Sequence, residues 1–171
     1  IRLAEKAPPG CEELLFFPYM LGERRKENTT SRGGFFGVTL QHSAQHFVRA
    51  VLEGVALAMG KDVATFRDRG LNVDRILSIG GGTRNSLWNQ IKANVTRAPL
   101  DISDEPEAGL KGAALLAAAG VGLIDDPAHV ARNRRAVTQQ IEPDPAAVDA
   151  YRSLQLEFNR VYDHMLGFWR S

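Results

Sequence analysis

The sequence feature that most constrains this chain is the segment 76–90, which reads ILSIGGGTRNSLWNQ. An apolar run ends at three consecutive glycines, Gly80, Gly81 and Gly82, and a polar stretch then precedes a helical pattern of apolar side chains. This pattern predicts a strand, a glycine turn and a helix. Glycine reaches backbone angles that other residues avoid, and a residue without a side chain lets a ligand approach the main chain closely.

The helix that follows the turn would begin with unpaired N–H groups and a partial positive charge, which suits a phosphate or a polar heterocycle. We therefore interpret the turn as the nucleotide side of a binding site. It is not a P-loop, because no Gly-Lys-Ser/Thr follows, and the glycine spacing does not match GxGxxG. The alternative is a tight strand-to-helix turn that binds nothing.

Composition narrows the class of protein. A chain of 171 residues with 44% hydrophobic residues is large enough for one domain with a real core. Its 21 basic and 20 acidic residues nearly cancel, so no basic excess points to nucleic acid or a membrane surface. Cys11 is the only cysteine, which excludes an intrachain disulfide and suits a cytoplasmic protein. The chain opens at Ile1 without a signal peptide, and we expect it to be a fragment or a processed piece.

The first half of the chain predicts two strands and a long helix. Residues 1–13 are expected to be a lead or linker, because Pro8-Pro9-Gly10 is a turn signal. Residues 14–21 predict a buried strand with Pro18 at its edge or end, and residues 33–40 predict a second strand after a polar loop. Residues 43–69 predict the longest helix, with Ser43 as its N-cap and Gly70 just after its end.

The second half continues the alternation. After the strand at 76–79, expected to be central, and a helix to about residue 97, residues 100–103 predict a short edge strand. Residues 107–122 predict a helix of small residues packed closely against the sheet. Residues 125–145 are expected to be a surface connector, and residues 146–171 a C-terminal amphipathic helix that docks on the same domain. With a core at 14–124, the pattern predicts an α/β domain with a mixed sheet flanked by helices.

Few other residues suggest chemistry. His42 and His46 lie four apart and could share a metal, but no third ligand is evident, and we interpret them as ordinary helix-start residues. Glu53 falls within the apolar pattern of the long helix, where a carboxylate needs a partner, so we predict a buried ion pair. No catalytic triad and no metal site is predicted.

The loop after the first predicted strand carries a run of charges, Glu23-Arg24-Arg25, and ends at Arg32. Such a run is either a solvated surface or an ion pair that fixes the loop near a cleft. The sequence leaves both open.

Five blocks follow one another along residues 14–122: FFPYMLGER (16–24), RGGFFGVT (32–39), RAVLEGVA (49–56), GGGTRNSLWNQ (80–90) and EAGLKGAALLAA (107–118). In their order and spacing they resemble the C-terminal half of the FGGY family of carbohydrate kinases, and the closing helix resembles the tail of the xylulose kinases in that family. The resemblance implies an actin-like ATPase domain of ribonuclease-H-like fold. It also implies use of ATP and Mg²⁺ to phosphorylate a sugar hydroxyl, with D-xylulose as the acceptor and ribulose, gluconate, erythritol or glycerol as alternatives.

The same resemblance implies the site residues. Gly81, Gly82 and Asn85 would contact the nucleotide, with Gly80 and Thr83 beside them, and Asn85 can both donate to and accept from a purine edge. The family's N-terminal half holds an Asp-x-Gly-Thr hairpin and the catalytic aspartate. This chain has no such motif, so we assign it no catalytic residue and expect a missing N-terminal kinase domain as its partner.

The chain departs from the family pattern at four places. Arg25-Lys26 stands in place of Thr-Pro, Ala93-Asn94 in place of Ala-Asp, Lys111 in place of a small or apolar residue, and Asn85 where xylulose kinases often have serine. The departures weaken the choice of xylulose over another sugar or polyol. Two rivals stay open: a non-catalytic actin-like module, and a relative of acetate kinases or chaperone ATPases, which the LGER and RAVLEG blocks argue against. A homodimer could form through the exposed faces of the 43–69 or terminal helix.

Overall fold

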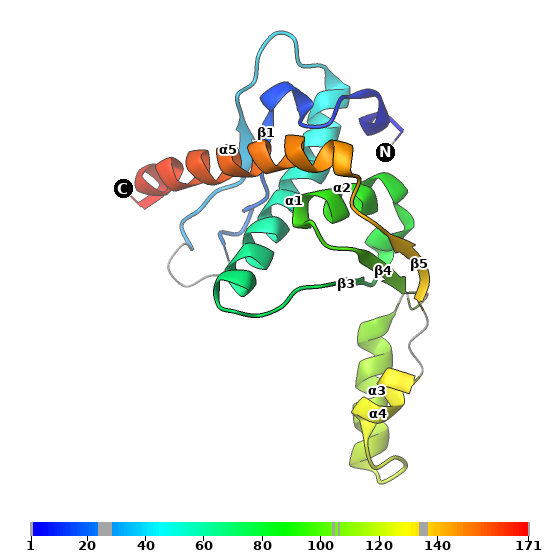
Figure 1. The fold of residues 1–171 in the computed structure, drawn as a ribbon. Coiled ribbons are helices and arrows are strands. Elements are labelled where there is room, and N and C mark those ends of the chain that lie inside the picture. The colour runs from blue at the N-terminus through cyan, green and yellow to red at the C-terminus, as the bar shows by residue number, and fades with distance from the viewer. Residues whose placement is uncertain (1, 24–28, 104, 106, 134–136, 171) are drawn as a thin grey trace.

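The computed structural model describes residues 2–23, 29–103, 105, 107–133 and 137–170 (Figure 1). The first half contains the short helices η1 (Ala4–Lys6) and η2 (Cys11–Glu13), strands β1 (Leu15–Phe17) and β2 (Gly34–Phe36), and helix α1 (Ala44–Asp68). The second half contains β3 (Ile76–Ser78), η4 (Gly81–Arg84), α2 (Ser86–Thr96), β4 (Leu100–Ser103), α3 (Ala108–Gly120), α4 (Pro127–Asn133), β5 (Val137–Ile141) and α5 (Pro145–Arg170). None of the helices in these residues is both long and apolar enough to span a membrane.

The strands form two small sheets. β1 and β2 pair antiparallel, with Phe16 opposite Phe35. In the other sheet β4 lies in the middle, parallel to β3 on one side and antiparallel to β5 on the other. The mixed sheet expected from the alternating pattern is therefore confirmed.

Helix α1 has the ends that its sequence predicts. At its start the Ser43 and His46 side chains each bond to the other residue's backbone in a capping box. At its end Gly70 adopts a positive φ of 78°, and the Leu71 N–H reaches back to the Phe66 carbonyl at 3.0 Å. This is the arrangement in which a left-handed glycine closes a helix.

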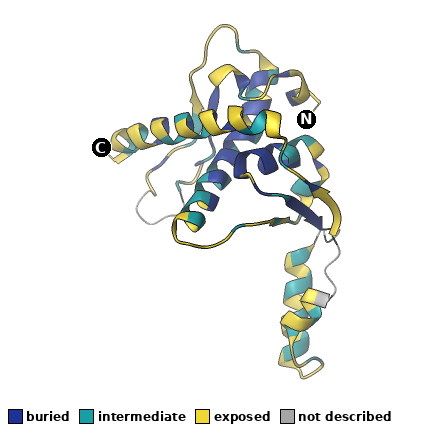
Figure 2. Ribbon diagram, in the orientation of Figure 1, coloured by how far each residue is buried: buried dark blue, intermediate teal, exposed yellow. Residues whose placement is uncertain are grey.

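α1 is the element on which the core is built. A side chain at Gly54 would collide with the Phe16 carbonyl, so β1 lies directly on α1. The amphipathic face of α5 covers the same core, as predicted, and Phe158 packs on Phe17 with ring centroids 4.7 Å apart. The main cluster of buried residues joins β1, α1, α2 and α5, which carry most of the buried positions in Figure 2.

A buried polar network ties three segments together, and it contains the ion pair predicted for Glu53. Only 1% of Glu53 is exposed, and its Oε1 accepts from Arg49 Nε at 2.7 Å, Tyr151 OH at 2.8 Å and the Gly10 N–H at 3.0 Å. Arg49 also donates to the Ala7 carbonyl at 3.0 Å and to Tyr151 OH at 3.0 Å. One carboxylate oxygen thus joins the N-terminal segment, α1 and α5.

The N-terminal segment differs from the expected lead or linker. η1 and η2 pack against α1, and Ala4, Ala7 and Cys11 are buried there. The turn at Pro8-Pro9-Gly10 folds the chain back onto α1 and does not separate it from the domain. The division of the chain into a core, a connector and a terminal helix stays a prediction.

β1, β2 and β3 are shorter than predicted, β4 has the predicted bounds, and the order of the strands in the sheet differs. β1 ends at Phe17, next to Pro18, which cannot donate a ladder hydrogen bond. The predicted central strand, β3, lies at the edge of the described sheet, and the predicted edge strand, β4, is central and fully buried. The cause is β5, which forms within the expected connector and pairs with β4; helix α4 forms there too.

The prediction that the small-residue helix, α3, packs closely against the sheet was wrong. α3 contacts α4 and projects away from the rest of the molecule (Figure 1), and no residue of α3 is buried. A Cβ added at Gly109 or Gly112 would meet nothing within 4 Å. Among the described residues, the close packing against the sheet that we expected of these small residues does not form.

We predict that Arg49→Met lowers the free energy of unfolding by about 3–5 kcal/mol, because it leaves the buried Glu53 charge without its partner. Urea denaturation measures the change. The matched control is Arg160→Met, which removes an equally close but exposed pair with Glu157 and should cost far less, because solvent screens that pair. Equal costs for the two variants would show that the buried network does not hold the fold.

We predict that the Cys11 thiol is inert in the folded protein. Its burial, reinforced by the nearby Glu53 carboxylate, raises the pKa of Cys11 above the ordinary thiol range. A thiol reagent at pH 8 should leave the Cys11 peptide unmodified by mass spectrometry and modify it once the protein is unfolded in urea, where the pKa returns to about 8.5. Rapid modification of the native protein would contradict this burial.

Candidate functional site

The glycine turn lies between β3 and α2, as predicted. Gly80 has φ 84° and ψ −175°, a conformation open essentially to glycine alone. The Thr83 N–H and Thr83 Oγ1 both donate to the Gly80 carbonyl, at 3.1 and 2.7 Å, which closes the turn on itself. The segment after Gly80 forms the short helix η4, so the turn is a fixed structure whose backbone geometry is set by its own hydrogen bonds.

Asn85 caps the helix that follows. Its Oδ1 accepts from the Trp88 N–H at 3.1 Å, and its backbone is extended, as an N-cap requires. Only 9% of Asn85 is exposed. The cap uses one lone pair of Oδ1, so a polar ligand could meet the amide N–H groups or the remaining lone pair of the oxygen.

The three glycines are not equivalent. Gly80 is needed for its backbone angle. At Gly82 an added Cβ would lie 2.8 Å from Trp88 Cζ3, so this glycine makes room for an indole ring. At Gly81 an added Cβ would meet nothing within 4 Å, and its φ is not in the left-handed region. No internal contact explains the missing side chain at Gly81, which is the position where a ligand could approach the backbone.

Two residues of α2 that were not singled out from the sequence support the turn. The Trp88 ring lies against Gly82, and its Nε1–H donates to the Leu52 carbonyl of α1 at 3.2 Å. Asn89, which is 2% exposed, donates from Nδ2 to the Thr83 carbonyl at 2.7 Å. The helical spacing of Trp88 had indicated only core packing, and nothing in the sequence singled out Asn89; the contact of both with the turn is a property of the tertiary structure.

Lys92 is a buried cation next to the turn. It is 8% exposed, its Nζ donates to Ser78 Oγ at 3.2 Å, and the same atom lies 4.7 Å from the centroid of the Trp88 ring. Burial lowers the pKa of Lys92. No carboxylate in the described part of the chain lies within ion-pair distance of it. A lysine on the apolar face of a predicted helix was the signal available in the sequence.

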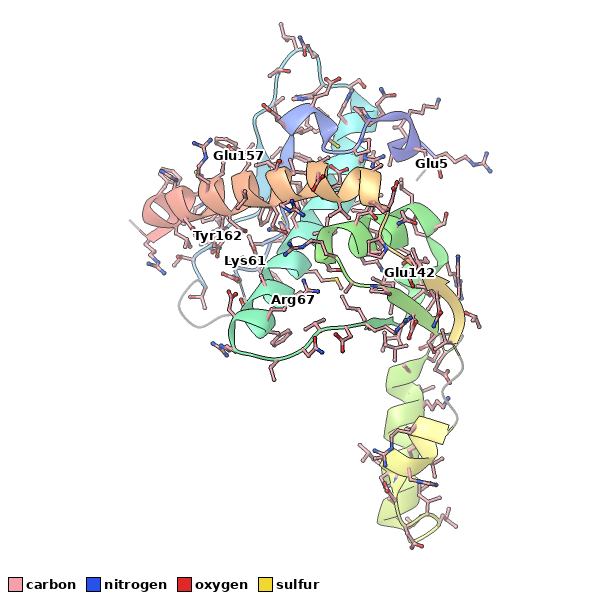
Figure 3. The ribbon with its side chains drawn as sticks, viewed as in Figure 1. Glu5, Lys61, Arg67, Glu142, Glu157 and Tyr162 are labelled. Atoms are coloured by element: carbon pink, nitrogen blue, oxygen red, sulfur yellow. The ribbon has the colours of Figure 1, made fainter. Side chains whose placement is uncertain are left out.

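Arg67 fixes the segment that leads into β3. Its guanidinium donates to the Thr96 carbonyl at 2.8 Å and to the Val73 carbonyl at 3.2 Å, and Figure 3 labels it near the C-terminal end of α1. The Arg67 side chain thus joins the end of α1 to the end of α2 and to the loop that precedes β3.

The two histidines behave as ordinary helix-start residues, in line with our interpretation. His42 Nδ1 accepts from the Thr39 N–H at 2.9 Å, and His46 Nδ1 accepts from the Ser43 N–H at 3.1 Å. Among the described residues, no three or more His, Cys, Asp or Glu side chains are grouped so that they could hold a metal ion. The pair caps α1.

Of the two interpretations left open for the charged loop, a solvated surface or an ion pair, the structure shows an ion pair at Glu23. Tyr162 OH donates to its Oε2, and Lys61 Nζ lies 3.9 Å from its Oε1. Lys61 also lies 3.5 Å from the centroid of the Tyr162 ring; Figure 3 labels both side chains where α1 and α5 meet. The network fixes the start of the loop against the two helices; Arg24 and Arg25 lie outside the described residues.

Comparison with known proteins assigns this architecture to a class. Residues 2–121 match the model of the FGGY family of carbohydrate kinases, C-terminal domain. The chain belongs to this family, whose members have the actin-like ATPase fold. The glycine turn, α2 and the whole of α3 lie within the matched residues.

The individual relatives are sugar kinases. The chain is 30% identical to the xylulose kinase of Bacillus subtilis (strain 168) over 161 residues, which is 94% of this chain and 32% of the relative. It superimposes on the crystal structure of xylulose kinase from Rhodospirillum rubrum with a TM-score of 0.83 and 34% identity, covering 99% of this chain and 34% of that one. For gluconate kinase from Lactobacillus acidophilus the TM-score is 0.80 and the identity 26%, over 96% of this chain and 34% of that one. The chain thus spans about a third of the length of these relatives.

We predict that Gly82→Ala lowers the free energy of unfolding by about 1–3 kcal/mol, because the new Cβ would overlap the Trp88 ring. Gly81→Ala should change it by no more than about 1 kcal/mol, because the space at Gly81 is open. Thermal unfolding of the two variants measures the difference. The same cost at both positions would mean that the turn, and not the indole, sets the requirement for glycine.

Proposed function

We propose that this chain is the ATP-binding part of a sugar kinase that transfers the γ-phosphate of ATP to a hydroxyl of D-xylulose. The observation that carries the proposal is the open backbone at Gly81, held in a rigid turn at the start of α2 in a chain of the FGGY family. We choose D-xylulose as the phosphate acceptor because several of the relatives are xylulose kinases. The likeness to gluconate kinase supports a second candidate, a kinase for another sugar, a sugar acid or a polyol.

In this proposal the turn holds the adenosine side of ATP. Gly81 and Gly82 would present backbone to the nucleotide, Asn85 would offer its amide N–H groups to the purine edge, and Gly80 and Thr83 would fix the shape of the turn. The N-terminal end of α2 adds a partial positive charge near the site. ATP itself supplies the phosphoryl group. The chemistry of phosphoryl transfer depends mostly on positioning and charge stabilisation, and the proposal gives this chain the positioning role.

The described residues do not form a site with enough ligands to hold Mg²⁺ by themselves. The described residues offer no cluster of three potential metal ligands. Mg²⁺ in kinases is held by one or two carboxylates together with the substrate phosphates. In the proposal the metal therefore arrives with ATP, and its carboxylates, like the catalytic base for the sugar hydroxyl, come from the N-terminal part of the polypeptide.

A cytoplasmic location belongs to the same proposal. It is supported by the use of ATP as phosphate donor and by a single buried cysteine without a disulfide partner in this chain.

The rival proposal is an actin-like module kept for assembly or regulation without catalysis. It is motivated by the absence of an Asp-x-Gly-Thr motif from this sequence. The coding sequence upstream of Ile1 separates the two: an Asp-x-Gly-Thr segment there supports the kinase, and a start codon directly before Ile1 supports the module.

The test uses the full-length protein and the Gly81→Val variant. We expect the variant to weaken ADP binding in calorimetry and to raise the KM for ATP by at least about tenfold, roughly 1.4 kcal/mol, with an unchanged melting temperature. The control is Gly167→Val in α5, a second open glycine, which should change neither quantity. Wild-type nucleotide affinity in Gly81→Val would show that the turn is structural. If the wild-type protein phosphorylates no ketose, sugar acid or polyol, the kinase proposal is wrong and the rival proposal of a non-catalytic module is favoured.

A further inference from the structure

The side of helix α2 that contacts the glycine turn and β3 is polar although it is buried. Four of its residues are at most 9% exposed and recur at the spacing of a single helix face: Asn85, Asn89, Lys92 and Thr96. A buried polar side chain is costly unless it is hydrogen-bonded. The contacts of this polar row therefore show what the row does.

Two members of the polar row hold the two ends of the glycine segment. Asn89 Nδ2 donates to the Thr83 carbonyl at 2.7 Å, directly after the third glycine. Lys92 Nζ donates to Ser78 Oγ at 3.2 Å, at the last residue of β3. The residues between these two points are 79–82, which include all three glycines of the turn. α2 thus holds the segment both before and after the backbone that is proposed to meet the nucleotide.

Lys92 also contacts the side chain that occupies the space at Gly82. Its Nζ lies over the Trp88 ring, 4.7 Å from the ring centroid, and a Cβ added at Gly82 would lie 2.8 Å from Cζ3 of the same ring. An ammonium over an indole is attracted to it, more strongly where water is excluded. One ammonium therefore acts on the segment in two places, at Ser78 and, through the indole, at Gly82.

Packing alone does not account for a lysine at this position. Lys92 is 8% exposed, and within the described ranges no carboxylate lies at ion-pair distance from its Nζ. An apolar side chain of the same length would fill the space without the cost of taking a charge out of water. What the ammonium adds is the pair of directed contacts with Ser78 and Trp88.

From this geometry we infer that Lys92 is a positioning residue for nucleotide binding, which fixes the glycine segment through Ser78 and Trp88. A segment held at both ends in its binding conformation loses less entropy when a ligand arrives, so the release of one end weakens binding without the loss of a ligand contact. The inference rests on the proposed function, because it takes the turn as the nucleotide site. It goes beyond that proposal by giving a role to a residue outside the turn.

The test is calorimetric titration of the full-length protein and its Lys92→Met variant with ADP. Methionine keeps the length of the side chain and removes the ammonium. We expect the Kd for ADP to rise by about tenfold, as the loss of a charged hydrogen bond can produce. The melting temperature should change by less than about 3 °C, because the lost contacts are offset by the loss of a buried charge.

Steady-state kinetics give a second readout, with ATP varied and D-xylulose as the acceptor. In Lys92→Met the KM for ATP should rise by a similar factor, and kcat should stay within about twofold, because Lys92 is given no part in the transfer step. Ser78→Ala combined with Lys92→Met should weaken ADP binding no further than Lys92→Met alone, since both changes remove the same hydrogen bond.

The matched control is Lys61→Met on α1. Lys61 is also a largely buried lysine over an aromatic ring, with its Nζ 3.5 Å from the centroid of the Tyr162 ring. It belongs to the network around Glu23 and not to the polar row of α2. This variant should leave the Kd for ADP within about twofold of the wild-type value, even where its melting temperature falls.

A tenfold loss of ADP affinity confined to Lys92→Met, at nearly constant melting temperature, supports the inference. An affinity within twofold of wild type overturns it, because the ammonium would then only occupy space. Equal losses in Lys92→Met and Lys61→Met, or a loss that comes with a large fall in melting temperature, also overturn it, because general loosening would be the cause. If the wild-type protein binds no ADP, the proposed function itself is contradicted and the inference falls with it; that result appears before any variant is compared, so the two failures are distinguishable.

Discussion

The fold depends on one buried charge and its partners. Glu53 lies at the centre of α1, and a single carboxylate oxygen accepts from Arg49, Tyr151 and the Gly10 N–H. An unpaired charge in this position would cost several kcal/mol, so the three segments have to meet there together. The N-terminal segment and α5 are thereby held on α1, whose adjacent surface carries β1 and α2.

The candidate site at the glycine turn is held rigid by hydrogen bonds between α2 and α1. α2 is joined to α1 by the Trp88 Nε1–H bond to the Leu52 carbonyl and, at its far end, by Arg67. Within α2, Trp88 and Asn89 then contact Gly82 and Thr83 directly. A binding backbone that is fixed in advance loses little entropy when a ligand arrives. The support of the turn and its exposed glycine are therefore parts of one arrangement.

Local signals carried most of the accurate predictions. Helix 43–69 was recognisable because its cap residue, its apolar spacing and Gly70 all agree. The turn at Gly80–Gly82 and the amphipathic face of α5 were recognisable for the same kind of reason. The family resemblance, which rests on the order of several such blocks, was confirmed. The contacts of Gly81 and Asn85 with a nucleotide stay a prediction.

What the sequence determined by itself was most of the local elements, the buried pairing demanded by Glu53 and the glycine turn with a helix behind it. The tertiary structure decided which strand is central, because β5 reaches β4 from a polar stretch whose pairing is non-local. It also decided the separate reasons for the glycines, since Gly82 faces an indole and Gly81 faces open space. The exposure of α3 belongs here too. Residue spacing reports which face of an element is apolar, whereas the surface that covers this face is set by contacts between residues distant in the chain.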